Sequence, residues 1–100
     1  MELPHFEHLE ARVRRQFVDI DTDTEQLKTV SEGVLLAYNV VKQLQTKPQA
    51  ESYTLIRCAL TDNPDPQMVK GFVSAMEELK CLHYWKAYTK EQRRRMGYDK

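Results

Sequence analysis

The sequence has few cysteines and no long apolar run, and each of these absences excludes a class of protein. Two cysteines in 100 residues, Cys58 and Cys81, do not make a disulfide framework, so we expect a reduced, cytoplasmic setting. No run of about 18 apolar residues is present, so we expect no membrane-spanning helix. Residues 1–15 carry acidic side chains and lack the apolar segment of a secretion signal. Length and composition predict one globular domain over residues 1–100.

Motifs of catalysis are also missing. The chain has three isolated glycines and therefore no glycine-rich phosphate loop: Gly33, Gly71 and Gly97. No serine stands in a nucleophile-elbow motif. Helical periodicity places Cys58 and Cys81 on the polar sides of their helices, outside any sequence context that lowers the pKa of a thiol. A site assembled only in three dimensions would leave no such motif, but the sequence itself predicts a protein that is not an enzyme and needs no cofactor.

Two groups of residues carry metal-ligating side chains, but neither has the spacing of a known site. The run Asp19, Asp21, Asp23 begins like a calcium-binding loop, yet it lacks the glycine at the sixth position and the glutamate at the twelfth. His5 and His8 stand one helical turn apart, and two imidazoles with this spacing match no zinc pattern. We therefore expect no bound metal.

The charges balance overall but are unevenly distributed. Fifteen lysines and arginines oppose fifteen aspartates and glutamates. Residues 80–100 carry seven cations against two carboxylates, a net charge of +5, so residues 1–79 must sum to −5. Four acidic residues lie close together in the first part: Asp19, Asp21, Asp23 and Glu25. This distribution predicts an electric dipole that steers association with charged partners.

The longest regular stretch is residues 22–46, which we predict to be a central helix. Its apolar side chains recur every three or four residues and therefore share one face: Leu27, Val30, Val34, Ala37, Tyr38, Val41 and Leu44. Thr22 and Glu25 have the spacing of a capping box at the start. Pro48 disfavours helical geometry just beyond the end. Because the apolar face is wide, we expect neighbours on more than one side.

A glycine lies inside this helix, where it costs roughly 1 kcal/mol relative to alanine. Gly33 precedes Ala37 by four residues, so the two small residues share a face. One interpretation is that this small pair lets another backbone come close. The other is a tolerated glycine with no role, and the sequence does not decide between them.

The remaining apolar repeats predict three more helices, over residues 4–18, 48–61 and 66–88. A strand is the less favoured alternative for residues 52–60, because their apolar side chains alternate poorly. Asp65 and Pro66 give the start signal of the fourth helix, and His83 falls on its apolar face, where we expect it to be partly buried. The predicted fold is all-α, either a small four-helix bundle or a looser helical array.

The segment after residue 82 allows three interpretations. The fourth helix continues to residue 88, or residues 82–89 form a strand or wing, or Thr89 and Gln92 cap a short basic helix over residues 90–96 that Gly97 closes. The environment of Trp85 depends on the outcome. A continuous helix projects its ring outward, whereas a bend after residue 82 lets the ring cover the core.

Residues 84–100 are the strongest candidate contact segment, because they combine cations with aromatic rings. The candidate residues for binding a partner or a nucleic acid are Tyr84, Trp85, Lys86, Tyr88, Lys90, Arg93, Arg94 and Arg95. Cations bind phosphates and rings stack on unpaired bases, while tryptophan, tyrosine and arginine dominate the energetics of protein interfaces. A helix-turn-helix with residues 66–79 as recognition helix is disfavoured by Glu77 and Glu78, which would repel phosphates.

These observations predict a non-enzymatic helical adaptor or assembly protein that acts by protein–protein docking. The partner would be another protein or a second copy, whose acidic residues 19–25 would receive the basic segment in a head-to-tail contact that builds rings or filaments. Small helical proteins are frequent in bacterial and phage assemblies, an analogy of size and composition. The alternative is a nucleic-acid-binding accessory protein that uses residues 86–95. Neither a membrane nor a small-molecule substrate is indicated.

Overall fold

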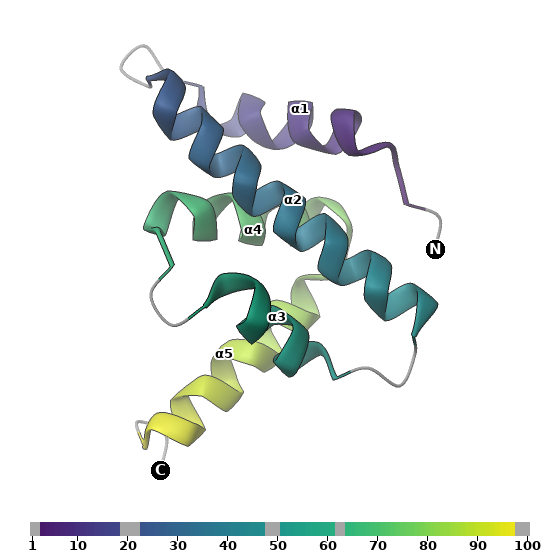
Figure 1. The fold of residues 1–100 in the computed structure, drawn as a ribbon, viewed down its shortest axis with the longest axis vertical. Coiled ribbons are helices and arrows are strands. Elements are labelled where there is room, and N and C mark those ends of the chain that lie inside the picture. Colours follow the sequence, from purple (N-terminus) through teal and green to yellow (C-terminus); the bar gives the residue numbers. More distant parts are fainter. Residues whose placement is uncertain (1–2, 19–22, 48–50, 62–63, 98–100) are drawn as a thin grey trace.

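The computed structural model describes residues 3–18, 23–47, 51–61 and 64–97, and within these ranges the chain forms five α-helices and no strand (Figure 1). The helices are α1 (Phe6–Phe17), α2 (Thr24–Thr46), α3 (Ser52–Leu60), α4 (Pro66–Glu78) and α5 (Leu82–Met96). The all-α fold and the first three predicted helices are confirmed. The fourth predicted helix, over residues 66–88, begins as predicted but ends at Glu78, because the chain breaks between α4 and α5. None of the helices described here combines the length and apolar character that a bilayer crossing needs.

Two aspartates cap the helices that form the centre of the molecule. Asp23 accepts a hydrogen bond from the backbone N–H of Gln26 at 2.7 Å, so α2 begins at an aspartate cap rather than at the predicted box of Thr22 and Glu25. Thr22 itself lies outside the described residues. At α4 the prediction is confirmed, since the side chain of Asp65 accepts from the N–H of Gln67 at 2.8 Å and Pro66 opens the first turn.

The core lies where α2 crosses α4 (Figure 1). Helix α2 packs against α1, α3 and α4, and α4 packs also against α1 and α5. Helices α1 to α4 supply the largest fully buried side chains: Leu9, Val13, Val30, Val34, Val41, Ile56, Leu60, Phe72 and Met76. The apolar face predicted for α2 is therefore confirmed at its centre. Each such side chain stabilises the fold by about 1.5–3 kcal/mol relative to remaining in water.

Two glycines let the backbones of α2 and α4 touch. A β-carbon on Gly33 would overlap the carbonyl oxygen of Met68 and lie 2.8 Å from the backbone nitrogen of Phe72. Reciprocally, a β-carbon on Gly71 would overlap the carbonyl oxygen of Val30. Of the two interpretations of Gly33, the close backbone approach is the one found, and the glycine without a role is excluded. The matching glycine on α4 was not recognised from the sequence.

The break between α4 and α5 is a Schellman motif with a lysine in the left-handed position. The N–H of Cys81 donates to the carbonyl of Met76 at 2.8 Å, and the N–H of Lys80 donates to that of Glu77 at 3.0 Å. Lys80 has a φ of 60°, a conformation that usually selects glycine. The side chains of Cys81 and Met76 are both buried, which matches the apolar contact that accompanies this motif.

Four predictions about residues 81–89 are corrected by the structure. Cys81 is buried rather than on a polar side, and burial raises the pKa of its thiol. His83 is exposed rather than partly buried, because α5 starts in a new direction. Thr89 caps no new helix, since its hydroxyl donates to the carbonyl of Lys86 within one continuous α5, and the strand alternative fails for the same reason. Gly97 closes α5 with a φ of 80°, as predicted.

We predict that Gly33→Ala and Gly71→Ala each destabilise the protein by about 2–3 kcal/mol, because a methyl group must push the two backbones apart. At an ordinary helix position the same change stabilises by roughly 0.5–1 kcal/mol, so the sign of the effect is the test. Urea unfolding monitored by circular dichroism gives the free energy of unfolding. Gly97→Ala is the control for the size of the effect. A β-carbon there meets nothing within 4 Å, so only the left-handed backbone of this residue contributes and the cost should stay near 1 kcal/mol. A Gly33→Ala variant as stable as the parent would refute the close crossing.

We also predict that Lys80→Gly stabilises the protein by about 1 kcal/mol, because it relieves the left-handed conformation of a residue with a β-carbon. Lys70→Gly is the control, since this exposed lysine lies inside α4 and its replacement should instead cost about 0.5–1 kcal/mol. Thermal unfolding compares the two variants with the parent. Equal destabilisation by both changes would contradict the Schellman assignment.

Candidate functional site

Aromatic side chains on the inner face of α5 attach this helix to the rest of the molecule. The ring centroid of Trp85 lies 5.7 Å from that of Phe72 and 5.4 Å from that of Tyr88. Tyr88 is buried and lies 5.2 Å, centroid to centroid, from Tyr53 of α3. Trp85 and Tyr84 are half-buried. The bend therefore turns the Trp85 ring onto the core, and the outward ring expected from a continuous helix is not found.

Hydrogen bonds add a specific link between α3 and α5. The hydroxyl of Tyr53 donates to Oε1 of Gln92 at 2.6 Å, and Nε2 of Gln92 donates to the hydroxyl of Tyr88 at 3.2 Å. Because this chain of polar groups is partly buried, its members are costly to leave without partners. It fixes the rotation of α5 about its own axis and therefore determines which side chains face outward.

The outward face of α5 carries a row of cations. Lys86, Lys90 and Arg93 are exposed and follow one another at spacings of four and three residues, so they lie along one side of the helix. We call these three residues the α5 cationic row. Among the described residues, none of the three has an ion-pair partner. Cations in a last turn complement the helix dipole, but Lys86 and Lys90 lie well before that turn.

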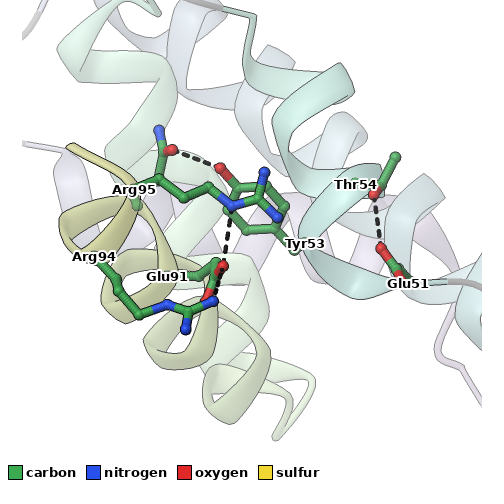
Figure 2. Close-up of polar contacts among 7 residues, drawn as sticks. Glu51, Tyr53, Thr54, Glu91, Arg94 and Arg95 are labelled. Atoms are coloured by element: carbon green, nitrogen blue, oxygen red, sulfur yellow. Dashed lines mark hydrogen bonds and ion pairs between the residues drawn. The ribbon is translucent and has the colours of Figure 1, made fainter. Parts of the chain in front are cut away.

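Glu91 is the carboxylate of α5, and it binds two arginines (Figure 2). Nη2 of Arg94 donates to Oε1 of Glu91 at 2.8 Å, and Nε of Arg95 donates to the same oxygen at 3.0 Å. These hydrogen bonds lower the pKa of the Glu91 carboxyl, and the carboxylate raises the pKa of Arg94. Two of the predicted binding arginines are thus tied to their own helix, although both remain exposed.

Arg95 also forms one wall of a cleft between α3 and α5. Its Cζ lies 4.4 Å from the centroid of the Tyr53 ring, a cation–π contact (Figure 2). The cleft has a volume of about 440 Å³ and is lined by Tyr53, Thr54, Arg57, Cys58, Thr61 and Arg95. No sequence pattern predicts this cleft, because Arg57 and Thr61 fall outside every recognised motif. Only the packing of α3 against α5 brings them to Arg95.

The predicted acidic surface is described only in part. Asp23 and Glu25 are exposed at the start of α2, whereas Asp19 and Asp21 lie outside the described residues. Figure 1 places the start of α2 and the end of α5 at opposite ends of the long axis. Helix α1 ends beside the start of α2, and its last turn contains Arg14. That end of the molecule therefore carries both signs of charge.

No metal site is evident in the described part of the chain. Within those ranges, no group of three or more histidine, cysteine, aspartate or glutamate side chains is placed to hold an ion. The rings of His5 and His8 pack edge to face, with their centroids 5.7 Å apart. Cys58 is exposed and Cys81 is buried.

The pairing of Glu91 with its arginines predicts a measurable titration. We expect its carboxyl to titrate below the ordinary value of 4.5, so the stabilisation from the pairs is present near neutral pH and is lost as the pH falls through the lowered pKa. Arg94→Gln should move this pKa upward. Arg93→Gln removes one positive charge from a residue that makes no hydrogen bond to Glu91, so it should raise the pKa of Glu91 less. The chemical shift of the Glu91 carboxyl carbon, followed by NMR across pH, gives the pKa. Equal changes of this pKa in the two variants would contradict the pairing.

Comparison with known proteins adds no relationship: no family model, curated protein or solved structure matches this chain.

Proposed function

We propose that this protein is a non-enzymatic docking component, an adaptor or assembly subunit, that binds an acidic surface of a protein partner through the α5 cationic row. The row itself carries the proposal. Its three side chains lie on the outer face of a helix whose inner face is fixed by rings and hydrogen bonds. Exposed cations on a helix of fixed orientation favour fast, selective association with an acidic surface.

The spacing of the row suits a regular acidic partner. Arg93 follows Lys86 by seven positions in the helix, a rise of about 10 Å. An acidic helix with carboxylates three and four residues apart presents charges at the same interval. Exposed ion pairs contribute only about 0.2–1 kcal/mol each, so several must form together for a useful contact.

A nucleic acid is the second candidate partner, favoured by the five cations and single carboxylate of α5. Two features disfavour it. Trp85 and Tyr88 are packed against other rings, so they do not offer the stacking platforms of single-strand binders. Helix α4, the recognition helix of the helix-turn-helix alternative, packs between α1, α2 and α5.

The test uses point variants rather than a truncation, because deleting residues 84–100 would remove Trp85 and Tyr88 from the core. The triple variant Lys86→Gln, Lys90→Gln, Arg93→Gln removes the α5 cationic row. The control Lys28→Gln, Lys42→Gln, Lys47→Gln removes three exposed lysines of α2 and its end. Fluorescence anisotropy at low salt measures binding to a labelled acidic helical peptide and to labelled single- and double-stranded DNA.

We predict that loss of the α5 cationic row weakens binding of the acidic peptide about tenfold, as expected when three ion pairs of about 0.5 kcal/mol each are lost, whereas the control variant binds like the parent. Binding of DNA alone, with a log-linear dependence on salt, would replace this proposal by the second candidate. Equal losses in the two triple variants, or no binding of any probe at low salt, would refute both. Light scattering at low and high salt tests self-association as the form of docking.

A further inference from the structure

We propose that the cleft between α3 and α5 is an oxyanion site, in which Arg57 and Arg95 bind a carboxylate or phosphate group carried on a small organic body. This inference is independent of the proposed docking function. It uses different arginines, since none of the α5 cationic row lines the cleft. The cleft's volume of about 440 Å³ exceeds what a bare anion needs and leaves room for an attached ring or short chain.

Arg95 is held in place by contacts with two neighbouring side chains. Its Nε donates to Glu91, and its guanidinium lies over the ring of Tyr53, as Figure 2 shows. Tyr53 is fixed in turn by its hydrogen bond to Gln92. Among the described residues, no acceptor binds the two terminal nitrogens of Arg95, which therefore keep four N–H donors for a ligand. A guanidinium fixed before binding loses little side-chain entropy on binding.

Arg57 supplies the second charge from the opposite wall. It is exposed on the last turn of α3, and within the described ranges its guanidinium has neither an ion pair nor a hydrogen bond. Two guanidinium groups on one cleft form the arrangement that recognises planar or tetrahedral oxyanions by paired hydrogen bonds.

Two carboxylates lie near the cleft and reduce its positive charge, but the cations of Arg57, Arg94 and Arg95 outnumber them. No carboxylate is among the described residues that line it. Glu91 is shared by Arg94 and Arg95, and Glu51 accepts a hydrogen bond from the hydroxyl of Thr54 at 3.2 Å (Figure 2). Tyr53 lines the cleft beside Arg95, so the favoured ligand combines an anionic group with an apolar or aromatic body.

The rate of chemical modification of Cys58 measures ligand binding in the cleft. Cys58 lines the cleft and is exposed, whereas Cys81 is buried, so a neutral maleimide modifies Cys58 first. Three probes each contain a benzene ring and differ in the attached group, which is a phosphate, a carboxylate or a neutral alcohol: phenyl phosphate, benzoate and benzyl alcohol. Their ability to slow Cys58 modification is measured at constant ionic strength. Phenyl phosphate and benzoate distinguish a phosphate from a carboxylate ligand, and benzyl alcohol reports the contribution of the ring alone.

We expect one or both anions to slow the modification of Cys58 several-fold in a saturable manner, while benzyl alcohol has little effect. Arg57→Gln should raise the half-maximal concentration at least about tenfold, without changing the circular dichroism spectrum, because Arg57 is exposed. Arg12→Gln, an exposed arginine of α1, is the matched control and should leave protection intact. The triple variant lacking the α5 cationic row should also retain it, which separates this test from that of the docking function.

Three results would overturn the proposal. The first is equal protection by benzyl alcohol and the anions, which would indicate an apolar cleft without anion selectivity. The second is unchanged protection in Arg57→Gln. The third is the absence of protection by either anion, with no movement of the Arg57 and Tyr53 NMR signals when phenyl phosphate or benzoate is added to the parent protein.

Discussion

The contact between the backbones of α2 and α4 is the constraint on which the rest of the structure depends. Ordinary helix pairs are held apart by their side chains, but Gly33 and Gly71 each place the partner's backbone where a β-carbon would stand. The close crossing brings Val34 and Phe72 into one buried core and leaves α1 and α3 to cover it from different sides. Close-packed protein interiors do not accommodate even one extra methyl group without movement of the surrounding atoms.

The turn at Lys80 sets the direction of α5 and therefore the environment of its side chains. A continuous helix would have carried its cations and rings away from the core, whereas the Schellman motif returns α5 to both α4 and α3. This return separates the two kinds of side chain that the sequence mixes. Trp85 and Tyr88 face inward and anchor the helix, and the α5 cationic row faces water. The cleft beside Tyr53 exists only because α5 comes back to α3.

The sequence was sufficient for the features that depend on local periodicity. The apolar face of α2, the Asp65–Pro66 start of α4 and the glycine end of α5 all follow from residues close together in the chain. The break at residues 79–81 was missed because its left-handed position holds Lys80 rather than the glycine that signals it. The cleft was missed because Arg57 and Arg95 come from different helices, and no local pattern relates them.

The repulsion among the cations of α5 supports the docking proposal, because these charges do not stabilise the isolated helix. Lys86 and Lys90 are four residues apart and Lys90 and Arg93 three apart, so each pair repels by about 0.2–0.5 kcal/mol. Glu91 could relieve neighbouring cations, but it is held by Arg94 and Arg95. The dipole of α5 favours cations in the last turn and gives no such benefit to Lys86 or Lys90 near its start and middle. A helix that accumulates like charges without internal compensation becomes more stable when an acidic surface binds it, which is the physical basis of the docking proposal.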